Sequence, residues 1–174
     1  MDIQSYSQHW TVKRLTCFAP DVLSDLRIPD FDKTFLRDVG MPTPGRKIGA
    51  NDLSWDVALT PVEKERRRIG WNYGSPYLIG EPDGTVMEAS RPQLPGAGLY
   101  NILPERRINS SVRQFAAFLT EEDMWRTRCP PYARDDVDNV SLLEERWVRI
   151  DPEAMADPMT YWQIFIDEER MPTQ

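Results

Sequence analysis

A hairpin signal in the middle of the chain limits its fold more than any other feature. The segment EPDG at 81–84 separates two strand-like runs, residues 77–81 and 85–89. Proline at the second position and glycine at the fourth suit a type I turn. Residues 53–59 add a strict alternation of apolar and other side chains, which is typical of a strand with one buried face. The sequence therefore predicts an antiparallel sheet.

Helix signals lie on both sides of this strand region. Before it, Asp30 or Asp32 can cap a helix whose apolar side chains lie near helical spacing, and Gly40 can end that helix. The last helix is expected from about 158 to 170. Capping residues predict further helix starts at Ser111, Thr120, Ser141, Asp151 and Asp157.

The order of helix, sheet and then helices predicts an α+β fold, because a parallel sheet would need alternating strands and helices. We expect a single domain over residues 1–174, with a central antiparallel β-sheet flanked by helices and a helical C-terminal third. Residues 99–103 are predicted as one more short strand. The charged segment 61–68 is predicted as an exposed loop or solvated helical turn, and residues 128–140, rich in proline and acid, as a loop.

Length and composition place the chain among ordinary globular proteins. With 174 residues, 40% of them hydrophobic, it can bury a core without disulfide or metal staples. Two cysteines, Cys17 and Cys129, predict reduced thiols. No apolar run has the length of a signal peptide or a membrane span, so we expect a soluble, cytoplasmic protein.

Acidic charge is concentrated at one end of the chain. The whole chain has 21 basic and 28 acidic residues and a net charge of −7. Residues 1–120 are nearly balanced, at +1, whereas residues 121–174 hold 6 basic and 14 acidic residues and reach −8. This charge argues against a general nucleic-acid or anionic-membrane binder and favours a basic partner. A merely solvated acidic surface is the alternative.

The residue pattern predicts no catalytic, cofactor or metal site. His9 is the single histidine, and neither it nor the two cysteines shows metal-ligand spacing. The acids around residue 138 depart from the calcium-loop order, since Val140 and Ser141 stand where that loop needs a ligand and a glycine. An enzyme would need a pocket that holds His9 or a close pair of carboxylates.

The acidic third also contains aromatic side chains, which commonly anchor protein interfaces beside complementary charge. Loop carboxylates are preferred because loop side chains need not serve a core. The candidate partner-binding residues are Glu121, Glu122, Asp123, Trp125, Tyr132, Asp135, Asp136, Asp138, Glu144 and Glu145.

Four separated stretches resemble the SUKH immunity superfamily, which includes the Smi1/Knr4-like proteins, and most closely its fourth branch, the SUKH-4 immunity proteins. They follow the family's order over much of residues 31–166, whereas residues 61–68 and 128–140 depart from its pattern. The stretches are FLRDVGMP at 35–42, IGEPDGTV at 79–86, INSSVRQFAAFL at 108–119, and IDPEAMAD at 150–157 followed by Trp162.

This resemblance implies an α+β fold and an immunity protein, without catalysis, that binds and neutralises a cognate polymorphic toxin. The toxins of such families are often nucleases or nucleic-acid deaminases, whose substrate clefts tend to be basic. We therefore expect the acidic third to occupy such a cleft, with no direct contact to nucleic acid or membrane, and the free chain to be a monomer. A regulatory adaptor of the Smi1/Knr4 type, without a toxin partner, is the alternative function.

Overall fold

The computed structural model shows two antiparallel sheets and several helices among its described residues. The larger sheet and a layer of long helices share one hydrophobic core, which runs from Tyr6 to Ile166. The described residues are 6, 8–10, 15–42, 53–55, 61–63, 66–72, 75–80, 82–88, 106–129 and 137–171.

The N-terminal part contains two short helices and a two-stranded sheet. Strand β1 (Leu15–Thr16) pairs with β2 (Met41–Pro42) in antiparallel fashion, and α2 (Pro20–Ser24) and α3 (Asp30–Asp38) lie between them in sequence. Gly40 follows the end of α3, as predicted. It has a φ of +87°, and its amide donates to the carbonyl of Phe35 over 2.8 Å. The predicted acidic caps are wrong, because the helix begins after Pro29 without a side-chain cap.

The main sheet is antiparallel and follows the order β3-β5-β6-β7-β8, with β4 paired to β5. All strand pairs are antiparallel. The α+β prediction with an antiparallel sheet is thus confirmed. The strands are β3 (Leu53–Trp55), β4 (Pro61–Glu63), β5 (Arg66–Asn72), β6 (Ser75–Gly80), β7 (Val86–Glu88) and β8 (Arg106–Asn109).

The predicted central hairpin is confirmed by β6 and β7. The Gly84 amide donates to the carbonyl of Gly80 over 3.0 Å, and the Gly80 amide donates to that of Thr85 over 2.8 Å. Gly84 has a φ of +78°, and a Cβ there would lie 2.7 Å from Oδ2 of Asp32. Only glycine fits this turn, because both the backbone conformation and the neighbouring carboxyl exclude a side chain.

The prediction of a loop or helical turn over residues 61–68 is wrong. This segment supplies β4 and the start of β5, and Arg66, Arg67 and Arg68 pair with β6 in the ladder. The charged sequence shows no strand alternation, so the pairing comes from a distant partner rather than from local propensity. Of the predicted strand 53–59, residues 53–55 form β3 and residues 56–60 lie outside the described residues, as does 99–103.

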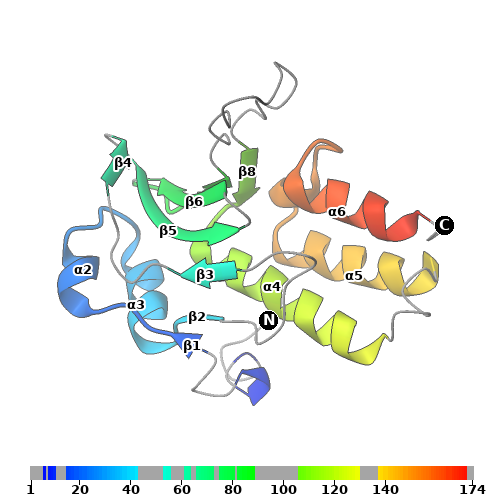
Figure 1. Cartoon of the computed structure of the whole chain (residues 1–174), viewed down its shortest axis with the longest axis horizontal. Helices are drawn as coiled ribbons and strands as arrows, with labels where there is room; N and C mark the ends of the chain where they lie inside the picture. Colours follow the sequence, from blue (N-terminus) through cyan, green and yellow to red (C-terminus); the bar gives the residue numbers. More distant parts are fainter. Residues whose placement is uncertain are drawn as a thin grey trace, which may run out of the picture.

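Long helices dominate the C-terminal third, as predicted. They are α4 (Val112–Arg128), α5 (Val137–Ile150) and α6 (Tyr161–Arg170), with a 3-10 turn η4 (Glu153–Met155) between the last two. Figure 1 shows α5 between α4 and α6, and the sheet beside this layer. The predicted cap at Ser111 is confirmed, because its hydroxyl accepts from the Gln114 amide over 3.3 Å.

Three predicted helix starts are wrong. Thr120 lies inside α4, where its hydroxyl donates to the carbonyl of Ala116 over 2.7 Å. Ser141 lies inside α5, which begins at Val137, so the loop predicted over residues 128–140 is wrong at both ends: Arg128 ends α4 and residues 137–140 belong to α5. The last helix begins after Thr160, whose side chain caps it, instead of after Asp157.

In place of the helix predicted after Asp151 there is a short 3-10 turn, η4, with Pro152 as its N-cap residue, and the buried carboxylate of Asp151 contacts this turn. This carboxylate accepts from the Ala154 amide over 3.3 Å and from the Ser110 amide over 2.7 Å. It also accepts from the Asn109 side chain over 3.1 Å. Asp151 therefore ties the end of β8 and the start of α4 to the turn after α5.

Candidate partner-binding surface

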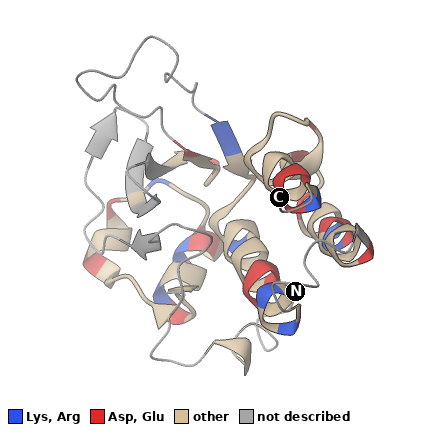
Figure 2. Cartoon of the chain, turned by 45° about the vertical axis from the view of Figure 1, so that its right-hand side comes forward, with Lys and Arg blue, Asp and Glu red and all other residues tan. Residues whose placement is uncertain are grey.

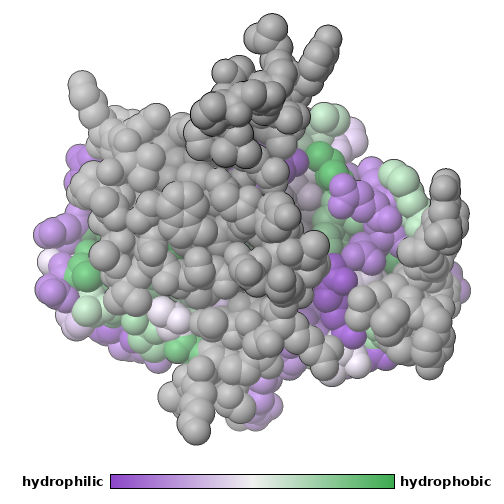
Figure 3. Space-filling view, in the orientation of Figure 1, coloured by the Kyte–Doolittle hydropathy of each residue, from purple (hydrophilic) through white to green (hydrophobic). Residues whose placement is uncertain are grey.

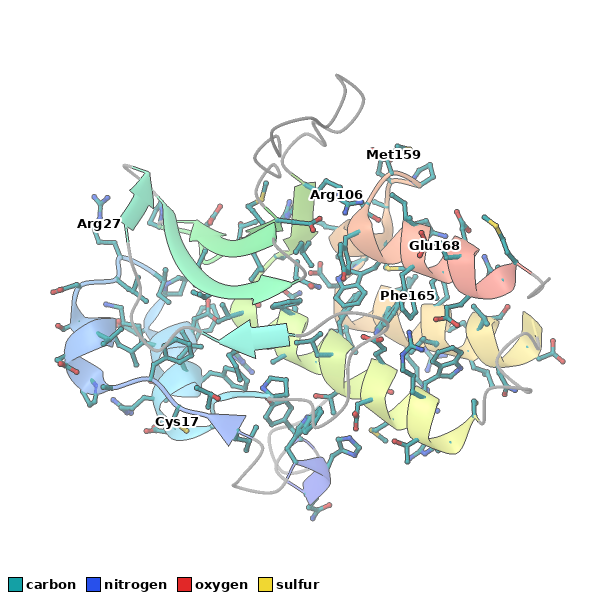
Figure 4. All side chains as sticks on the ribbon, viewed as in Figure 1. Cys17, Arg27, Arg106, Met159, Phe165 and Glu168 are labelled. Carbon is teal, nitrogen blue, oxygen red and sulfur yellow. The ribbon has the colours of Figure 1, made fainter. Side chains whose placement is uncertain are left out.

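The three long helices pack through a cluster of aromatic side chains. The rings of Phe118 and Trp147 stack with a centroid distance of 5.1 Å, and Trp162 lies 4.8 Å from Trp147. Phe165 lies between α6 and α5, with its ring 5.5 Å from that of Trp147 (Figure 4). This cluster fixes which side of each helix faces inward, and so decides which acids reach the surface.

Glu122 is directed inward. It is 1% exposed, and Arg126, one helical turn later, donates to it over 2.8 Å. Arg126 also donates to Glu169 of α6 over 2.9 Å, and its guanidinium lies 5.2 Å from the ring centre of Phe165. Burial raises the pKa of Glu122 to about 7, against the opposing charge of Arg126. This triad joins α4 to α6.

Two further acids of the predicted set join neighbouring helices. Arg146 of α5 donates to Glu121 of α4 over 2.9 Å. Arg170 of α6 pairs with Glu144 of α5, which also accepts from Gln163. We call these two pairs and the triad around Arg126 the helix seam. Its carboxylates are engaged within the chain.

Asp123 and Trp125 also make internal contacts. Nε2 of His9 and Oδ2 of Asp123 lie 2.8 Å apart, which holds the N-terminal segment against α4. Trp125 is buried, and its ring packs against that of Phe165. Burial therefore gives Glu122 and Trp125 a role in packing, and we remove both from the proposed contact surface.

A different set of side chains lies on the outer side of α5. Asp138, Leu142 and Glu145 follow the i, i+4, i+7 spacing of one helix face, opposite the buried Val140 and Trp147. All three are exposed, and Leu142 is 53% exposed. We call them the α5 outer face. Sequence analysis missed Leu142, although its helical spacing from the two acids was the available signal.

Figures 2 and 3 show the charges and the hydropathy of the long-helix region as a whole. Figure 2 shows acidic and basic residues on both α5 and α6, and the pair of Arg170 with Glu144 joins these two helices. The described surface over these helices is mostly hydrophilic in Figure 3, with smaller apolar patches. Tyr132, Asp135 and Asp136 lie outside the described residues, and their contact role stays a prediction.

The described residues offer little for catalysis. His9 is engaged with Asp123, and Cys17 and Cys129 are not joined in a disulfide. Within the described ranges, no three His, Cys, Asp or Glu side chains lie close enough to hold a metal ion. None of the helices in these ranges is long and apolar enough to cross a membrane. The α5 outer face combines exposed acidic and apolar side chains, as protein interfaces commonly do.

Comparison with known proteins supports this interpretation. The family model of the SUKH-4 immunity protein matches residues 2–168. No curated protein and no solved structure matches the chain. The matched region covers nearly all of the chain, including the sheet and the three long helices. The chain therefore belongs to the SUKH-4 immunity protein family.

Proposed function

We propose that this protein neutralises a cognate toxin that acts on nucleic acid, a nuclease or a deaminase domain, by occupying its basic substrate cleft. The family assignment supports an immunity role in general. The choice of toxin class rests on charge, because a cleft that binds phosphates attracts carboxylates as well.

The α5 outer face carries the proposal. Two carboxylates flank one exposed leucine, so a partner would meet an apolar anchor between acidic side chains. Buried apolar anchors usually supply most of the affinity of an interface, and surrounding charges set orientation and association rate. The seam carboxylates bridge separate helices and are largely buried, whereas Glu145 is well exposed, so the contact surface is much smaller than the total acidic charge indicates.

The segment before α5 extends the proposed surface. Asp135 and Asp136 immediately precede the helix that starts at Val137, and Tyr132 lies a few residues earlier. We propose that these three side chains contact the toxin together with Asp138 and Glu145. Replacing Asp135, Asp136 and Asp138 by Asn should leave the melting temperature nearly unchanged and weaken toxin binding. Unchanged affinity would remove them from the surface.

Electrostatic attraction would act before contact. Complementary fields can raise association rates to about 10⁸ M⁻¹s⁻¹ or more at low salt. Such speed suits an inhibitor that must reach a toxin before the toxin reaches nucleic acid. Once bound, the carboxylates would occupy positions that phosphates need, so inhibition would be competitive with the nucleic-acid substrate.

Growth rescue tests the function directly. The chain would be co-expressed with the toxin candidate encoded by the adjacent open reading frame, and survival is expected. The double variant Asp138→Lys and Glu145→Lys should lose rescue. The matched control Asp21→Lys and Asp25→Lys changes the net charge equally on exposed positions around α2 and should keep it.

Two results would contradict the proposal. Equal loss of rescue in both double variants would show that total charge matters rather than the α5 outer face. Rescue by both would exclude this face as the contact. A chain that binds a host protein but rescues growth from no neighbouring toxin would instead support the regulatory adaptor.

A further inference from the structure

A pocket of about 570 Å³ lies at the opposite end of α5 from Asp138. Side chains from α3, from the turn after β6, from the first turns of α4 and from the end of α5 line it. Its volume is in the usual range of ligand sites and suits two or three side chains of a peptide. The lining residues used in the argument are Phe31, Phe35, Asp83, Arg113, Arg149 and Ile150.

Two arginines bring positive charge to this pocket. Arg113 is exposed, and its guanidinium lies 5.6 Å from the ring centre of Phe31. Among the described residues, Arg113 has no carboxylate within ion-pair distance. Arg149 meets Glu145 over 3.3 Å, but both side chains are well exposed, and such pairs hold little energy. Both guanidinium groups are therefore available to a new anion at small cost.

The pocket wall is held rigidly around these arginines. The Ser111 hydroxyl caps α4, and the Gln114 side chain donates to the carbonyl of Ile150 over 3.1 Å. The Ser110 hydroxyl donates to buried Asp151 over 2.8 Å. The start of α4 is thus fixed against the end of α5, so the positive end of the α4 dipole and the negative end of the α5 dipole meet at this pocket and the arginines supply its positive charge.

The remaining lining residues indicate the kind of anion. Asp83 accepts from the Thr85 amide over 2.9 Å, and this bond holds its pKa below the usual range, so Asp83 stays charged. In the lining, Arg113 and Arg149 outnumber Asp83; close by, Glu145 meets Arg149, and buried Asp32 lies within reach of the charge of Arg113 but, with a pKa of about 7, is partly protonated near neutral pH. So small an excess of positive charge suits a single carboxylate better than a phosphate. Phe31, which is 55% exposed, and Ile150 offer an apolar surface beside it.

We propose that this pocket binds an acidic segment of a protein partner, with one carboxylate between Arg113 and Arg149 and an adjoining apolar side chain against Phe31. The site is opposite in charge to the α5 outer face and goes beyond the function proposed above. Arg149 follows Glu145 by four residues on the same side of α5, so one partner can reach both regions.

Peptide titration of the full chain tests this pocket without any toxin. The probe is the capped peptide acetyl-Gly-Leu-Glu-Glu-Leu-Gly-amide, and its counterpart has Gln in place of both Glu. Binding is followed by calorimetry and by the arginine side-chain signals in NMR spectra. The acidic peptide should bind at least about tenfold more tightly than the Gln peptide, as expected for a charge-assisted contact.

Variants locate the binding on the chain. Arg113→Gln should weaken binding of the acidic peptide about tenfold, and Phe31→Ser should weaken it as well. Arg128→Gln removes another exposed arginine, at the far end of α4, and should change nothing. Melting temperatures verify that each variant is folded.

Three results would overturn the pocket proposal. The first is that the acidic and Gln peptides bind equally well. The second is that the Arg113 and Arg128 variants weaken binding of the acidic peptide equally. The third is that inorganic pyrophosphate binds more tightly than the acidic peptide. None of them bears on growth rescue, so this proposal and the immunity function can fail separately.

Discussion

The helix seam and the α5 outer face contain the same kinds of charged residue but use them differently. In the seam, Glu122 is buried and contacts Arg126, which holds α6 to α4. On the outer face, Asp138 and Glu145 are exposed on either side of Leu142. The net charge of a segment therefore says little about its binding surface until the helix packing is known. Seam charges should control stability, and face charges should control association.

Replacing Arg126 should give the largest effect on stability. Arg126→Met leaves buried Glu122 without its main cation, and a lost partner of this kind costs about 3 kcal/mol. The loss should grow only above about pH 7: below it Glu122 keeps its proton in both folded proteins, whereas above it the original chain carries the charge beside Arg126 and the variant, whose Glu122 pKa lies higher still, continues to lose stability. Urea unfolding at several pH values measures both effects.

The control for this variant is Arg149→Met. The pair that it removes is exposed on one helix, so the expected change in the free energy of unfolding is below about 0.5 kcal/mol. If Arg126→Met and Arg149→Met lowered the free energy of unfolding equally, the seam and the outer face would not differ in their effect on stability.

Replacing Leu142 should weaken binding of the toxin while leaving the stability of the folded chain unchanged. Leu142→Ala removes an exposed side chain, so the free energy of unfolding should stay within about 0.5 kcal/mol. Loss of an interface anchor should speed dissociation of the toxin about tenfold. Surface plasmon resonance measures this rate. Val148→Ala, another exposed apolar position of α5, is the control, and an equal effect there would exclude Leu142 as the anchor.

Asp32 is buried like Glu122 but lacks a bonded cation, so it shows what a buried carboxyl group does to stability without one. Within the described residues its carboxyl oxygens have no hydrogen-bond partner, and burial raises its pKa to about 7, against the charge of Arg113. The folded chain therefore binds a proton on the Asp32 carboxyl group more tightly than the unfolded chain does. The free energy of unfolding falls as the pH rises from about 4 to 7.

Asp32→Asn should remove that penalty. The variant should match the original chain at pH 4 and exceed its stability by about 1 kcal/mol or more at pH 8, where the carboxylate is charged. Thermal unfolding across this range measures the difference. A constant difference at every pH would show that Asp32 does not titrate with a raised pKa.

Local signals made the hairpin and the end of α3 predictable. Gly84 and Gly40 each have a positive φ, which few residues other than glycine adopt. The cap at Ser111 depends on neighbours within one turn, so the sequence again contains the whole signal. These elements lie within the stretches that carried the family resemblance.

Long-range contacts account for what the sequence did not reveal. Thr120 resembles a helix start, but its hydroxyl accepts from buried Trp10 and donates within α4, so the helix continues. Residues 66–68 form a strand because β6 pairs with them. The burial of Glu122 follows from the packing of α6 on α4, which no local spacing specifies. For the same reason, the sequence could not separate seam acids from face acids.

The salt dependence of the association rate with the toxin shows whether the carboxylates of the α5 outer face guide binding. It should be measured for the original chain and for Asp138→Asn with Glu145→Gln, from low to high ionic strength. The original chain should lose at least about tenfold in rate, because screening shortens the reach of its charges. The variant should start slower and converge with it at high salt. A salt-independent rate for the original chain, or identical curves for the two proteins, would contradict the account.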